Sequence, residues 1–170
     1  YFAARHLYDL APYSPVGKEQ VGTLPDRFDA MAPNYYWLNV ARFYAGCYSK
    51  GELPSLFASL VALSEKDIYS LVSHAQELTG MLLSDWVFAQ DRRSLKNAID
   101  LALSGVGAWK SICSDDAEAG DSGVGLRLPK GAGQEELANR LMELIINESP
   151  KDLRDEALSL LSSNLSRVDR

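Results

Sequence analysis

Apolar residues recur at the three- and four-residue spacing of an α-helix along most of this 170-residue chain. No long segment alternates between apolar and polar residues, and only residues 124–128 are a candidate for a short strand. The pattern therefore predicts an all-α protein. The expected helices cover residues 1–10, 53–63, 65–79, 91–106, 135–147 and 150–168, and a further one begins at Leu82.

Several of these predicted helices follow one another after short turns, as 53–63 does with 65–79 and 135–147 with 150–168. Consecutive helices joined by short turns pack as antiparallel pairs. We expect seven or eight helices in a multi-helix array of such pairs. The array would have either α-solenoid (HEAT-like) or helical-bundle character.

The segment from residue 35 to residue 48 is apolar or aromatic at nearly every position. A helix that is apolar almost all round is a buried helix, so we expect this one to lie at the centre of the domain. Its single narrow polar strip recurs at intervals of three, four and three: Asn39, Arg42, Gly46 and Ser49.

Turn-forming residues divide the remainder of the chain. Residues 11–33 are rich in Pro and Gly, which predicts a connector with one short helical turn around Phe28–Met31. Gly80 is expected to end the helix before it, and Asp91 is expected to cap the helix after the one that begins at Leu82. We therefore expect three parts: a helical domain over 1–110, a flexible Gly/Ser/Asp-rich linker or loop over 111–133, and a helical pair over 134–170.

The net charge of −6 argues against nucleic acid as a partner, because that binding draws its affinity from Lys and Arg side chains on phosphates. The same charge disfavours an anionic membrane surface, and no apolar run approaches the ~20 residues of a membrane-spanning helix. The two cysteines, Cys47 and Cys113, are far apart and in no metal or redox spacing. We therefore expect a reducing, cytoplasmic setting.

Two segments resemble ligand loops but fail in detail. Residues 105–111 (GVGAWKS) lack the Gly that precedes the Lys of a phosphate-binding loop, since Trp109 stands before Lys110. Residues 115–123 (DDAEAGDSG) lack the ligand spacing of a calcium loop. We therefore expect no cofactor and no metal in this chain, and we predict no catalytic residue.

The two histidines and the three tryptophans are interpreted as structural. His74 is expected to be a partly exposed helical residue with no catalytic or metal role, because no Cys or second His lies near it in sequence. The aromatic run Tyr35–Trp37 is interpreted as core rather than as a stacking platform for a ligand. The tryptophans are expected to be core or interface anchors: Trp37, Trp86 and Trp109.

Two short segments resemble motifs of the NACHT-type STAND NTPases, the class that includes animal NOD-like receptors and bacterial antiviral relatives. Residues 1–7 (YFAARHL) are similar to the second half of a segment of the form F-Q-E-[YF]-[FL]-A-A-x-x-L, which follows the nucleotide-binding core in that family. After a connector, the family has a Trp-containing helix that ends in F-x-A-G. The matching residues here are Trp37, Val40, Phe43, Ala45 and Gly46.

The resemblance covers the first 50 residues and implies that the chain is a fragment. The ATP- and Mg²⁺-binding motifs would then lie upstream, in a parent protein that is an ATPase. The fragment would be a non-catalytic regulatory and sensor segment, with roles in autoinhibition, ligand sensing and oligomerisation in defence signalling and innate immunity. Its partners would be the upstream domains of its own chain and a protein ligand or further copies of itself.

The first helix supplies the candidate interface residues. Its apolar side chains spread over more than one helical face, so they cannot all point into one small core, and we expect an exposed apolar patch. The candidates are Tyr1, Phe2 and Tyr8. Two alternatives remain open: a self-contained helical adaptor or scaffold domain for protein–protein interaction, and an enzyme hidden in an all-helical bundle.

Overall fold

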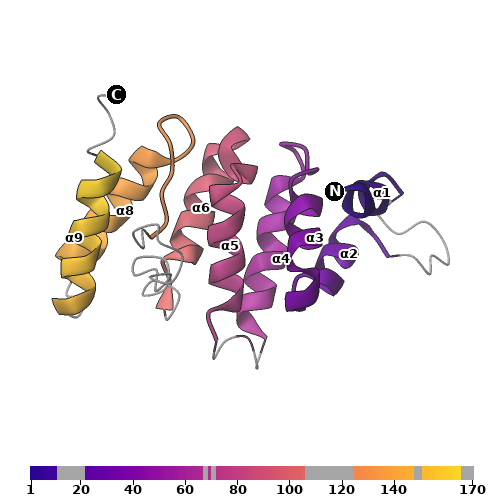
Figure 1. Cartoon of the computed structure of the whole chain (residues 1–170), viewed down its shortest axis with the longest axis horizontal. Helices are drawn as coiled ribbons and strands as arrows, with labels where there is room; N and C mark the ends of the chain where they lie inside the picture. Colours follow the sequence, from indigo (N-terminus) through magenta and orange to yellow (C-terminus); the bar gives the residue numbers. More distant parts are fainter. Residues whose placement is uncertain (11–21, 67–68, 70–71, 106–124, 148–150, 166–170) are drawn as a thin grey trace.

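The structure is a computed structural model that describes residues 1–10, 22–66, 69, 72–105, 125–147 and 151–165. Within these residues the fold is all-α, as predicted, with packed helix pairs and no strand. Figure 1 shows the helices standing side by side in a row, from α1 near the N-terminus to α9 near the C-terminus. The predicted linker and the two ligand-loop mimics fall partly or wholly on residues 106–124, outside the described part.

The first half of the row contains four helices: α1 (Phe2–Asp9), α2 (Leu24–Met31), α3 (Leu38–Ala45) and α4 (Leu53–Glu65). The helix α2 is longer than the single turn predicted there. Thr23 and Asp26 form a capping box at its start, in which the Thr23 hydroxyl accepts from the Asp26 N–H and the Asp26 carboxylate accepts from the Thr23 N–H. This cap and Pro25 in the first turn explain why the connector ends in a full helix.

The second half contains α5 (His74–Ser84), α6 (Arg92–Ala102), α8 (Gln134–Ile146) and α9 (Lys151–Leu165). The predicted cap at Asp91 is confirmed, because its carboxylate accepts from the Ser94 N–H at 2.9 Å. The helix predicted over 65–79 is wrong at both ends. It begins at His74, with α4 running on to Glu65, and it continues through Gly80 and Leu82 to Ser84. A short 3₁₀ helix over Val87–Gln90 follows.

One buried apolar cluster runs through the whole row and includes Phe28, Tyr44, Leu60, Leu78 and Leu137. Residues 125–133 have no regular structure, so the suggested strand at 124–128 is absent from its described part. That segment nevertheless adds side chains to the core, namely Leu126 and Leu128. None of the helices in the described ranges has the length and apolar character that crossing a membrane requires.

The aromatic segment predicted as a buried central helix is a half-exposed one. It begins as a 3₁₀ helix over Tyr35–Trp37, continues as α3, and buries only one side. Tyr36 is 98% exposed, and Trp37 and Phe43 are also exposed, so the prediction of a core position for the run Tyr35–Trp37 was wrong. Trp86 is exposed as well, which excludes a core role for it.

Candidate functional site

Three exposed aromatic side chains on α1 and α3 form what we call the aromatic surface: Tyr1, Phe2 and Phe43. The Tyr1 ring meets Phe2 and Phe43 edge to face, with ring centroids 5.9 Å and 6.3 Å apart. Phe2 is 88% exposed, Tyr1 67% and Phe43 51%. Exposed apolar patches of this kind mark interaction sites.

Helical geometry explains why Phe2 points outward. The inward face of α1 carries Ala4, which is fully buried, with the partly buried Leu7 and Tyr8 at i+3 and i+4. Phe2 lies two residues before Ala4, about 200° away around the helix at ~100° per residue. The packing of α1 on α3 therefore leaves Phe2 on the solvent side.

The position of Phe43 follows from the inward face of α3. Ala41, Tyr44 and Ala45 are buried there, and Tyr48 continues the same face beyond the helix end. Phe43 falls outside that face. Sequence analysis missed Phe43 as an interface residue because nearly every position from 35 to 48 is apolar or aromatic, and periodicity alone could not show which side of this helix is covered.

The third predicted interface residue, Tyr8, lies in a different environment. Its ring packs against Tyr44 at 5.9 Å and Tyr48 at 6.0 Å, and its hydroxyl donates to Glu52 Oε2 at 2.8 Å. Burial, followed by this hydrogen bond, raises the pKa of Tyr8 to about 12. The structure therefore brings Tyr1 and Phe2 together with Phe43 and separates them from Tyr8. Their binding to a partner stays a prediction.

A second candidate site is a groove of about 800 Å³ between α6 and α8. The α6 wall carries Arg92, Arg93 and Lys96, and the fully buried Ile99 also lines the groove. The α8 wall adds a mixture of charged, amide and apolar side chains, listed here in chain order: Glu136, Asn139, Arg140, Met142, Glu143 and Ile146. A volume of this size accommodates a small ligand or a short peptide segment.

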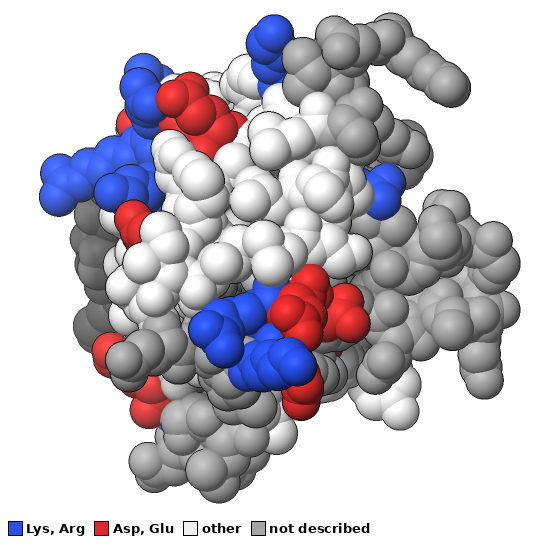
Figure 2. Space-filling view, turned by 90° about the vertical axis from the view of Figure 1, so that its left-hand side faces the viewer, with Lys and Arg blue, Asp and Glu red and all other residues white. Residues whose placement is uncertain are grey.

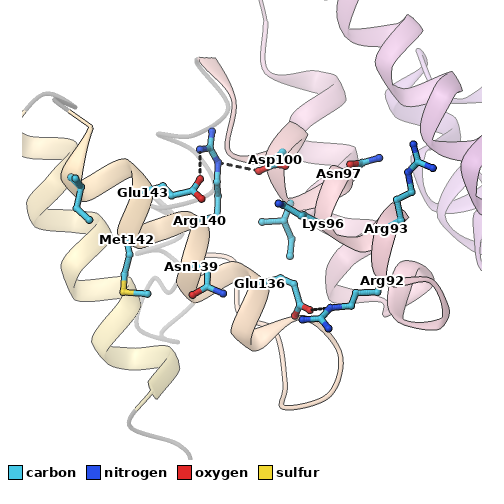
Figure 3. Close-up of a pocket in the computed structure, with 12 residues that line it drawn as sticks. Arg92, Arg93, Lys96, Asn97, Asp100, Glu136, Asn139, Arg140, Met142 and Glu143 are labelled. Atoms are coloured by element: carbon cyan, nitrogen blue, oxygen red, sulfur yellow. Dashed lines mark hydrogen bonds and ion pairs between the residues drawn. The ribbon is translucent and has the colours of Figure 1, made fainter.

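Two ion pairs cross the groove. Arg92 Nε lies 2.9 Å from Glu136 Oε1, and Arg140 Nε lies 3.2 Å from Asp100 Oδ1 (Figure 3). Arg140 also binds Glu143 on its own helix at 3.0 Å. The Arg140 Nε–H forms no hydrogen bond with Asp100, so this second contact is an ion pair held by charge alone. Together these contacts fix α8 beside α6.

The histidines and Cys47 do not converge on a site. His6 is exposed on α1, whereas His74 is 2% exposed, so the prediction of a partly exposed His74 was wrong. Its Nε2 lies 2.6 Å from the Ala32 carbonyl oxygen, and its ring packs beside Tyr35. Within the described ranges, no three His, Cys, Asp or Glu side chains are placed together to hold a metal ion.

The α9 end of the row presents a further surface. Figure 2 shows an uncharged area in the upper middle of this face, with one group of acidic and basic side chains at its upper left and another directly below it. Leu158 and Leu165 on α9 are about half exposed.

Comparison of the sequence with protein-family models, with curated proteins and with solved structures found no match.

Proposed function

We propose that this chain is a non-catalytic helical regulatory and sensor segment of a NACHT-type STAND NTPase, acting in the cytoplasm. In this proposal the aromatic surface binds an apolar surface of the ATPase region of the same protein. In this role the segment holds the resting state closed and releases oligomerisation when a ligand binds. The aromatic surface is the observation that carries the proposal.

The support is that the aromatic surface is built from the two segments that carry the resemblance. Tyr1 and Phe2 belong to the first motif-like segment, and Phe43 belongs to the second. The structure packs α1 against α3, so the two segments are neighbours. Burying an aromatic side chain contributes about 1.5–3 kcal/mol, so three of them suffice for a regulated, reversible contact between domains.

The first test is the reading frame upstream of Tyr1. A STAND NTPase requires the sequence G-x-x-x-x-G-K-[ST] there, because its Gly-rich backbone wraps the phosphates and its Lys contacts them. A continuous upstream reading frame without this motif would exclude the proposal. The alternative would then be a self-contained helical adaptor or scaffold domain, which the α6–α8 groove also suits.

The second test measures binding of the separately expressed ATPase region to this chain by calorimetry. We expect saturable binding that Phe2→Asp combined with Phe43→Asp abolishes, because two carboxylates would have to be desolvated in the contact. Leu158→Asp, at the other end of the row, is the matched control and should leave binding unchanged. Equal binding by the double variant and the unaltered chain would exclude the aromatic surface as the contact.

A further inference from the structure

Two ion pairs join α6 and α8 across the groove, and one basic side chain of α6 lies between them. Positions 92, 96 and 100 recur every four residues and share one face of α6. Arg92 pairs with Glu136 at one end of the groove, and Asp100 pairs with Arg140 at the other. Lys96 lies between these two pairs (Figure 3). Within the described part of the chain Lys96 has no ion-pair partner.

We propose that the α6–α8 groove binds an acidic peptide segment of a partner protein, with one carboxylate of the peptide seated between the two ion pairs on Lys96. The Asn139 side chain lines the same groove, and its amide can donate to the carboxylate or to the peptide backbone. The inference does not depend on the proposed function, because the groove lies among other helices than the aromatic surface (Figure 1).

Charge complementarity selects an acidic ligand. The groove contains four basic side chains and three acidic ones, a net charge of +1 on a chain whose net charge is −6. Arg92, Arg140 and the three carboxylates are engaged with one another, which leaves Arg93 and Lys96 as the cations without an ion-pair partner among the described residues. A local excess of positive charge on an acidic protein attracts and orients an anionic ligand.

The remaining lining favours a peptide over a nucleic acid. Met142 and Ile146 are exposed at the α8 edge, where they can contact an apolar side chain beside the carboxylate. A phosphate backbone carries a charge on every nucleotide, and the carboxylates of Asp100, Glu136 and Glu143 would repel it. A peptide can place one acidic residue at Lys96 and an apolar residue at Met142 without that repulsion.

Fluorescence anisotropy tests the inference on the whole chain, with a labelled octapeptide that carries one Glu beside one Leu and is otherwise uncharged. We expect saturable binding with a micromolar dissociation constant. Lys96→Glu should raise the dissociation constant of the octapeptide by about tenfold, because the variant loses one partly desolvated contact between opposite charges and gains a repulsion between two carboxylates. Lys66→Glu, an equal change of charge at the end of α4, should leave binding unchanged, and so should the Phe2→Asp, Phe43→Asp double variant. That last result separates this inference from the proposed function.

Two further probes decide the class of ligand. Replacing Glu by Gln in the octapeptide should weaken binding by about tenfold, and Asn139→Ala should weaken it by less. A labelled oligothymidylate should not compete with the peptide. The inference is overturned if the acidic octapeptide shows no saturable binding, if it binds the Lys96→Glu and Lys66→Glu variants equally, or if the oligothymidylate displaces it.

Discussion

Arg27 should hold α1 in place, and its replacement by Met tests this. Arg27 is buried, and its guanidinium donates to the carbonyl oxygens of Leu7, Leu10 and Gly22. The Nη2 contact with Leu10 is 3.1 Å and the Nε contact with Gly22 is 3.3 Å. Leu7 lies in the last turn of α1 and Leu10 is its C-cap residue. At this end of a helix the carbonyl oxygens lack helical partners and the helix dipole favours a cation.

The expected loss of stability follows from these contacts. Hydrogen bonds to a charged group contribute at least about 1.5 kcal/mol each, which gives roughly 4–5 kcal/mol for three. Part of this is offset, because Met removes the cost of burying a guanidinium and water can reach the exposed Leu10. We therefore expect Arg27→Met to lower the free energy of unfolding by about 2–3 kcal/mol and the melting temperature by roughly 5–10 °C.

Urea denaturation and amide hydrogen exchange measure the two parts of this prediction. The urea midpoint should fall with little change in slope, and exchange should accelerate most in residues 2–10, because an eight-residue helix is not stable alone. Arg5→Met is the control on α1 itself, since Arg5 is exposed, pairs with the exposed Asp9 one turn on and lies over the Tyr8 ring, so it does not connect α1 to another helix through its ion pair. If Arg27→Met and Arg5→Met give the same midpoint and the same exchange in α1, the anchoring role of Arg27 is refuted.

Two further predictions concern alkaline stability and a tight turn. Burial raises the pKa of Tyr8 and of Tyr44 to about 12. The stability that their neutral forms contribute is therefore complete below pH 10 and is lost as the pH rises from 10 to 12. Ultraviolet absorbance at 295 nm and circular dichroism should change together in this range, and Tyr8→Phe should make the stability depend less on pH. Gly133→Ala should destabilise the chain by more than Gly131→Ala in thermal denaturation. Both glycines have a positive φ, but of the two only Gly133 has side-chain atoms close by: an added Cβ would lie 2.9 Å from Leu128 Cδ1. Equal falls in melting temperature for the two variants would contradict this steric clash.

The sequence predicted the helices whose caps and stripes agree. For α6, the Asp91 cap and the apolar stripe from Leu95 to Ala102 point to one helix, and the structure confirms it. Gly80 misled the prediction because Gly costs a helix only about 1 kcal/mol relative to Ala. Burial of Leu82 and Leu83 beyond it outweighs that cost, so the helix continues to Ser84.

The candidate sites were harder to predict, because each depends on pairings between distant residues. Tyr1 and Phe2 could be expected at an exposed surface from the spread of apolar residues around their helix. Phe43 could not, because only the packing of α1 and its neighbours determines which side of α3 faces solvent. The groove depends on Arg92 meeting Glu136, a residue 44 positions later, and no local pattern encodes that contact.

Ion pairs between neighbouring helices recur along the exterior of the row. Arg42 on α3 binds Asp85 at the end of α5 through two hydrogen bonds of 2.8 Å, and Arg92 on α6 binds Glu136 on α8. Exposed ion pairs of this kind contribute little stability, so their effect is to fix which neighbouring helices lie together while the apolar core supplies the free energy. Lys96 lies between two such ion pairs and binds no carboxylate of the described residues. The aromatic surface likewise has apolar side chains without a covering helix among the described residues. At both places the described residues leave side chains exposed, and the contacts proposed above would cover them.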